Sequence, residues 1–138
     1  MPSDETSTTA FLNVDLDLHA QHGIGELLGY FGTSATVLNQ TELFASIEST
    51  KNHDSLEEAI RNLIELIHTL PPEGRNVWNQ CDYRRFNIGI EGGNEPHAAE
   101  FTISSEVVSL LAGIQAEMIL TIYAPARSTG TSKTTAVG

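Results

Sequence analysis

Cysteine is almost absent from this 138-residue chain, in which Cys81 is the only one. A disulfide within the chain is therefore excluded, and the cysteine usage gives no sign of an oxidising compartment. Long hydrophobic runs are also missing, since no stretch approaches the roughly 20 apolar residues that a membrane helix needs. Residues 1–10 lack the basic start and apolar core of a signal peptide, so we expect a cytoplasmic protein.

Positive charge is also scarce, with seven Lys and Arg against 18 Asp and Glu, which gives a formal net charge of −11. Such a chain repels phosphate backbones and anionic membranes, so we expect neither nucleic acid nor a membrane as partner. The same charge attracts a basic protein and speeds its encounter. The hydrophobic content of 40% is typical of a globular protein of about one domain.

Both ends of the chain are rich in Ser, Thr and Gly and poor in large apolar residues. Such segments cannot bury enough surface to offset the entropy of ordering them, which predicts flexible tails at 1–10 and 126–138. No repeat and no linker-like stretch interrupts the part between the tails. We therefore expect a single domain over 11–125.

Strands are predicted by alternation of apolar and polar residues. The pattern over 12–18 indicates a strand with one buried and one wet face, and 35–49 indicates one irregular strand or a hairpin. Two further alternating segments, 84–90 and 99–103, flank a Gly-rich turn and predict an antiparallel hairpin. The almost wholly apolar segment 118–123 favours a strand that is covered on both sides or central in the sheet.

Helices are predicted by apolar residues three and four positions apart, over 24–31, 56–70 and from about 106 to 115. The second has two overlapping capping boxes, from Asp54 and Ser55, and Pro71 and Pro72 stop it. The element order predicts an α+β fold: a single, mostly antiparallel sheet of about five strands with about three helices packed on one face.

A metal site is one candidate for chemistry. Asp15, Asp17 and His19 share a face of the first strand, and His22 follows in the next turn. Carboxylate and imidazole groups at this separation can hold a divalent cation. Alternating polar residues are equally what any half-exposed strand shows, so this spacing is not diagnostic.

The turn after the strand at 84–90 is a second candidate. Glu91, Glu95, His97 and Glu100 gather there, where a loop can bring a carboxylate and an imidazole together for acid–base work. Loops are also simply polar, and no complete catalytic set and no cofactor motif is present. If the protein has a basic partner, the carboxylates of both acidic segments are the expected binding residues: Asp15, Asp17, Glu91, Glu95 and Glu100.

Two further features have structural interpretations. Cys81 is a nucleophile only if neighbouring cations lower its pKa, and without a paired His it is more typical of a small core residue beside Trp78. The glycines at 89, 92 and 93 precede a strand rather than a helix, which favours turn geometry and close backbone approach over a phosphate cradle.

Several motifs in the second half of the chain resemble those of a known family. They are Leu70-Pro71-Pro72-Glu73, Val77-Trp78-Asn79-Gln80-Cys81, the run from Arg85 to Gly93, Glu95-Pro96-His97 and the run from Ile119 to Pro125. This pattern is similar to an uncharacterised small bacterial domain family, some of whose members are presumed toxin-immunity proteins. The resemblance implies a bacterial cytoplasmic protein that neutralises a toxin by binding it, and it carries over no catalytic residue.

Three interpretations of function therefore stay open. The first is an acidic protein-binding module with a basic partner such as a toxin. The second is a small metal-dependent or acid–base enzyme of unknown substrate. The third is a homo-oligomeric structural protein, a homodimer for example, in which a strand edge near Phe44, Ile119 and Tyr123 pairs across a two-fold axis.

Overall fold

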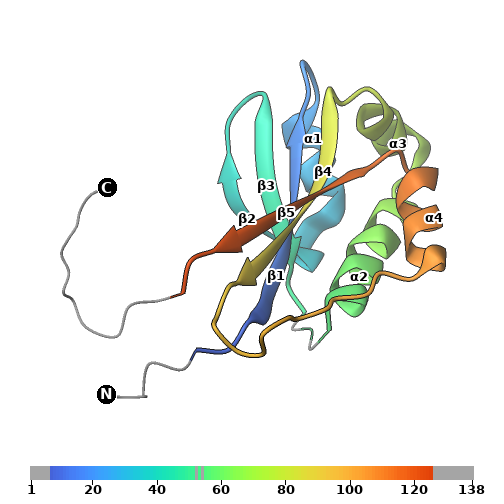
Figure 1. Cartoon of the computed structure of the whole chain (residues 1–138). Coiled ribbons are helices and arrows are strands. Elements are labelled where there is room, and N and C mark those ends of the chain that lie inside the picture. Colours follow the sequence, from blue (N-terminus) through green and yellow to red (C-terminus); the bar gives the residue numbers. More distant parts are fainter. Residues whose placement is uncertain (1–6, 52, 54, 126–138) are drawn as a thin grey trace.

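The computed structural model describes residues 7–51, 53 and 55–125 of the chain. Its five strands form one sheet in the order β2-β3-β1-β4-β5, with the helices against one face (Figure 1). The strands are β1 (Ala10–His19), β2 (Ala35–Gln40), β3 (Phe44–Ser49), β4 (Tyr83–Glu91) and β5 (Glu117–Tyr123). The helices are α1 (Ile24–Phe31), α2 (Leu56–His68), α3 (Pro72–Asn79) and α4 (Ser105–Gly113), and a 3-10 turn, η2 (Gly32–Ser34), follows α1. The predicted α+β fold with a mostly antiparallel sheet is confirmed.

The central strand β1 shows why the layers form. Val14, Leu16 and Leu18 are buried, whereas Asp15 and Asp17 between them lie on the opposite face. Buried residues of β3, β4 and all four helices join the same hydrophobic cluster on one side of the sheet. The period-two pattern of β1 therefore decides which face the helices cover.

The described part of the chain contains four helices rather than about three. Ser55 caps α2 by accepting a hydrogen bond from the Glu58 amide, as predicted, and α2 ends at His68 rather than at residue 70. The proline pair that stops α2 also starts α3, because Pro72 fits the first helical position, where no amide donor is needed. The local pattern indicates these prolines only as the end of a helix, so α3 was not predicted. Asp54, the other predicted cap, lies outside the described residues.

The predicted hairpin between 84–90 and 99–103 is wrong. Residues 97–104 form no strand, and β5 occupies the edge of β4 instead, in parallel register from Arg85 opposite Glu117 to Glu91 opposite Tyr123. The β5 segment is the more apolar of the two, so it has more to gain by joining the sheet. The sheet is consequently mixed, and β5 is an edge strand.

The segment after β4 is held by the start of the chain. The Thr9 amide donates to the Glu95 carbonyl at 2.8 Å, and the amides of Asn94 and Glu95 both donate to the Ser7 carbonyl at 3.0 Å. Gly93 lies so close that an added Cβ would come within 2.7 Å of the Ser7 carbonyl oxygen and the Thr9 amide nitrogen. Close backbone approach, the interpretation favoured for these glycines, is what this contact requires.

Arg84 and Trp78 tie the helix ends to the sheet. The Arg84 guanidinium donates to the carbonyls of Trp78, Cys81 and Gln115 at 2.9 to 3.0 Å, and the Trp78 indole donates to the Ile114 carbonyl at 2.9 Å. These carbonyls lie at or just beyond the ends of α3 and α4, where intrahelical donors run out. Among the described residues, no helix has the length and apolarity to cross a membrane.

Candidate functional site

The sheet face opposite the helices is the first candidate surface, and we call it the open face. Strand register places polar side chains on it from four adjacent strands: Asn13, Asp15, Asp17 and His19 of β1, Ser46 and Glu48 of β3, Arg85 and Asn87 of β4, and Glu117 and Thr121 of β5. Because no described helix covers this face, these groups are available to a partner.

A row of hydrogen bonds crosses the open face. The Ser46 hydroxyl donates to Asp17 at 2.7 Å, the Asn87 amide donates to the other Asp17 oxygen at 3.5 Å, and the Thr121 hydroxyl donates to Asn87 at 2.7 Å. On β4, next to Asn87 on the same face, Arg85 donates to Glu117 of β5 at 2.5 Å and lies over the Tyr83 ring. Asp17 therefore has partners from both neighbouring strands.

Asp15 is in the opposite situation. Its Oδ1 atom is buried and has no hydrogen-bond partner among the described residues. Continuing the β1/β3 register places Glu48 opposite it, and Asp17 follows on the same face. Partial burial, and then the negative charges of Glu48 and Asp17, raise the pKa of Asp15 to about 6. We call Asp15, Asp17 and Glu48 the carboxylate cluster.

The residues predicted to bind a metal are only partly brought together. Asp15, Asp17 and His19 do share the open face, but His19 is engaged by Asp82 at 2.7 Å, and His22 is exposed beyond the end of β1. The hydrogen bonds from Gln21 and His19 lower the pKa of Asp82. Within the described ranges, no three His, Cys, Asp or Glu side chains lie close enough to hold a metal ion.

The acidic residues predicted around the turn after β4 lie apart from the cluster. Glu91 lies on the open face at the end of β4, opposite Tyr123, whereas Glu95 contacts the chain start and Glu100 lies in the exposed segment before α4. His97 lines a groove on the helix side of the sheet. The turn therefore does not assemble the predicted acid–base pair.

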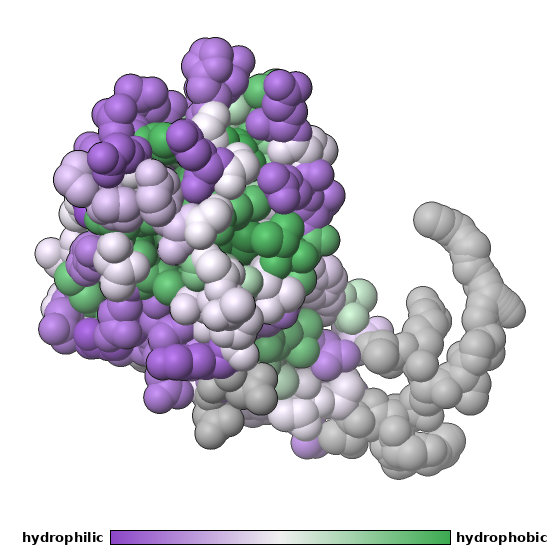
Figure 2. Space-filling view, turned by 180° about the vertical axis from the view of Figure 1, so that it is seen from behind, coloured by the Kyte–Doolittle hydropathy of each residue, from purple (hydrophilic) through white to green (hydrophobic). Residues whose placement is uncertain are grey.

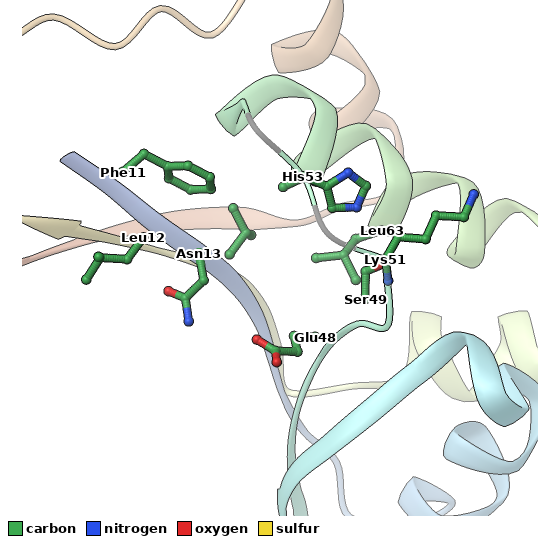
Figure 3. A pocket seen from close by; sticks show the side chains of 10 residues that line it. Phe11, Leu12, Asn13, Glu48, Ser49, Lys51, His53 and Leu63 are labelled. Carbon is green, nitrogen blue, oxygen red and sulfur yellow. The ribbon is translucent and has the colours of Figure 1, made fainter.

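A cleft of about 480 Å³ opens where β3 separates from β1. Figure 3 shows Phe11 and His53 above the β1 ribbon and Leu12, Asn13 and Glu48 below it, so the cleft reaches both sides of the sheet. The His53 side chain is 11% exposed, and its Nε2 atom is buried with no partner in the described chain. Glu48 thus connects this cleft to the carboxylate cluster.

The second candidate surface is the edge of the sheet at β5. On the helix side, Met118, Leu120 and Ile122 are 39%, 61% and 67% exposed, because the helix layer does not reach them. A groove of about 420 Å³ runs beside them, lined mainly by apolar side chains that include Leu56, Ile90, Phe101 and Ile103. The prediction that this strand is covered on both sides is therefore wrong.

Hydrophobic surface is not confined to β5. Seen from behind, hydrophobic residues reach the surface across the middle of the molecule, whereas the upper and lower-left rims are hydrophilic (Figure 2). On the opposite edge strand, β2, Val37 and Leu38 are 45% and 47% exposed. Phe44 and Ile119, which were expected beside a pairing edge, are half-buried, and Tyr123 is exposed.

Cys81 is a core residue, as the favoured interpretation held. It is buried, its thiol contacts the Val77 carbonyl at 3.5 Å, and desolvation raises its pKa despite the nearby Arg84. A raised pKa disfavours the thiolate, which is the nucleophilic form.

Comparison with known proteins adds no constraint. No protein-family model, curated protein or solved structure matches this chain. The candidate surfaces are therefore assessed on their own geometry. Sequence reasoning missed Glu48 and His53. Glu48 lies near Asp15 only because β3 pairs with β1, and His53 is buried only by the path of the chain. No local sequence pattern indicates either.

Proposed function

We propose that this chain is a protein-binding module that takes a basic segment of another protein on the open face of its sheet. The observation that carries the proposal is the carboxylate cluster, in which a buried oxygen of Asp15 has no hydrogen-bond partner within the described chain. Like charges on adjacent strands destabilise the fold. The cation opposite Asp17 on β4, Arg85, binds Glu117 at 2.5 Å. A lysine or arginine of another protein, placed over the open face, would offset the charge of Asp15, Asp17 and Glu48.

The charge of the whole chain supports the same conclusion. A net charge of −11 accelerates encounter with a basic surface, and the uncovered face leaves the cluster accessible to it. Neutralisation of a toxin, the role that the resemblance implies, is one use of such binding. The metal-dependent form of the enzyme interpretation has no set of three His, Cys, Asp or Glu ligands within the described residues.

The test uses co-expression with the products of neighbouring genes, followed by purification and binding kinetics at several salt concentrations. The variant Asp15→Asn/Asp17→Asn/Glu48→Gln removes the cluster. The control Glu26→Gln/Glu65→Gln/Glu73→Gln removes three exposed carboxylates from the helices, so both chains change from −11 to −8 (−11 plus three neutralised charges).

We expect the cluster variant to slow association by about tenfold or more and to flatten its salt dependence, with little effect in the control. Equal slowing by both variants would show that net charge alone matters. Absence of any complex with a basic neighbour product would contradict the proposal.

A further inference from the structure

The apolar edge of the sheet has a backbone feature that matches its side chains. The Gly92 amide donates to the Tyr123 carbonyl at 2.7 Å, so this carbonyl points toward β4. Backbone groups alternate along a strand, so the amides and carbonyls of Met118, Leu120 and Ile122 point away from β4. No described strand lies beyond β5 to bond them. The three residues with uncovered side chains thus also carry the unpaired backbone groups.

We propose that β5 pairs with β5 of a second copy of this chain, antiparallel across a two-fold axis, with Leu120 of each copy opposite the other. A two-fold axis perpendicular to the sheet produces antiparallel pairing of identical edges. This register places Met118 opposite Ile122 of the second copy. The outward-pointing amides and carbonyls of Met118, Leu120 and Ile122 then all form hydrogen bonds with the second copy. The side chains that face each other on the helix side are all apolar.

Charge favours a second copy over a basic partner at this edge. Glu117 is the only charged residue of β5, and Arg85 of the same chain binds it at 2.5 Å. In the proposed register Glu117 lies opposite Tyr123 of the second copy, so no like charges face each other. Two strongly acidic chains can therefore meet through this strand, whereas a basic segment would find no free carboxylate on it.

Two other segments of the chain are less suited than a second β5 to pair with the β5 edge. Residues 126–138 contain one large apolar residue, Val137, and cannot supply an apolar strand that alternates over the length of β5. The opposite edge, β2, carries the polar Asn39 and Gln40, and a bulge at Leu38 interrupts its register. Irregular edges of this kind resist pairing.

The groove beside β5 fits this arrangement. Leu120 and Ile122 form part of its wall. Because Met118 of the second copy lies opposite Ile122, its flexible side chain is next to the groove and can cover apolar surface there. This inference does not depend on the proposed function, since the open face takes no part in it.

The mass of the full chain in solution tests the proposal, measured by light scattering across a dilution series. We expect twice the 15.0 kDa of one chain. Leu120→Lys places two like charges face to face at the axis and should yield the single-chain mass. Leu38→Lys is the matched control, since Leu38 is 47% exposed on the other edge strand, and it should leave the mass doubled.

Amide hydrogen exchange distinguishes pairing of β5 with a second β5 from other ways of covering this strand. In the dimer the amides of Met118, Leu120 and Ile122 are protected, and Leu120→Lys should expose them while the inward amides of Ile119 and Thr121 stay protected. That retained protection also shows that the variant folds. A single-chain mass at every concentration, equal dissociation by Leu38→Lys, or protection of the three amides in a monomer would overturn the proposal.

Discussion

At the scale of single residues, Asp15 and Asp17 show how two neighbouring carboxylates on one strand come to differ. Asp17 accepts hydrogen bonds from Ser46 and Asn87, whereas one oxygen of Asp15 is buried with no partner among the residues described. The negative charge of Glu48 also acts on the Asp15 carboxyl group. Folding therefore gives Asp17 two hydrogen-bond partners, whereas it disfavours the ionised form of Asp15.

The raised pKa of Asp15 gives stability a defined pH dependence. Because this pKa is about 6 in the folded chain against an ordinary value of 3.8, the folded state holds the proton more tightly. The free energy of unfolding should fall as pH rises from about 4 to about 6. Allowing for the partial exposure of the group, Asp15→Asn should raise that free energy by about 1–2 kcal/mol at pH 7 and by little at pH 4.

Thermal or urea unfolding across this pH range measures the effect. Asp17→Asn is the control, because it removes the same charge from the same face but weakens hydrogen bonds that Asp17 already has. A difference between wild type and Asp15→Asn that does not vary with pH would contradict the assigned cause. If Asp15 also binds a basic partner, the variant gains stability while it loses binding.

At the scale of elements, the contact between the chain start and the turn after β4 depends on one glycine. Gly93→Ala brings a Cβ within 2.7 Å of backbone atoms of Ser7, Thr8 and Thr9, which cannot move aside as a side chain would. We expect a loss of about 1–3 kcal/mol of unfolding free energy, together with faster exchange of the Thr9 amide. Chemical denaturation and hydrogen exchange measure both.

Gly29→Ala is the matched substitution for this test. Gly29 lies within α1, and nothing comes within 4 Å of an added Cβ. Alanine favours helix more than glycine does, so this variant should gain up to about 1 kcal/mol. If both variants changed stability in the same direction, close approach at Gly93 would not be the cause.

At the scale of the whole molecule, the two proposals combine. A two-fold axis perpendicular to the sheet keeps both open faces on the same side of a continuous ten-stranded sheet, counted as two copies of the five strands. Two carboxylate clusters would then face a partner together, which raises the apparent affinity for any partner that presents two basic segments.

Stoichiometry tests this combination. We expect wild type to bind two copies of a monomeric partner per dimer and Leu120→Lys to bind one per chain, with little change in the affinity of a single site because the open face is unaltered. Light scattering of the purified complexes measures both ratios. One partner per wild-type dimer would show that the two faces do not act independently.

The sequence by itself determined most of the elements, although not α3, and it determined which face of β1 is buried. Alternation along β1 predicted which side is buried, and capping and apolar spacing predicted α1, α2 and α4. The pattern of 35–49 left open one irregular strand or a hairpin, and β2 and β3 form the hairpin. These are local signals, carried by residues within a few positions of one another. They also placed Asp15 and Asp17 on a wet face, but they could not show that Glu48 joins them.

Only the tertiary structure decided which strand pairs with β4. Local alternation favoured 99–103, but strand pairing is a competition between segments far apart in sequence, and the apolar β5 took the edge. The same competition explains why β5 has the composition of a covered strand and yet lies exposed, with Leu120 and Ile122 uncovered. The composition of β5 therefore favours burial, whereas the fold of one chain leaves Leu120 and Ile122 exposed. The proposed pairing with a second copy would bury them.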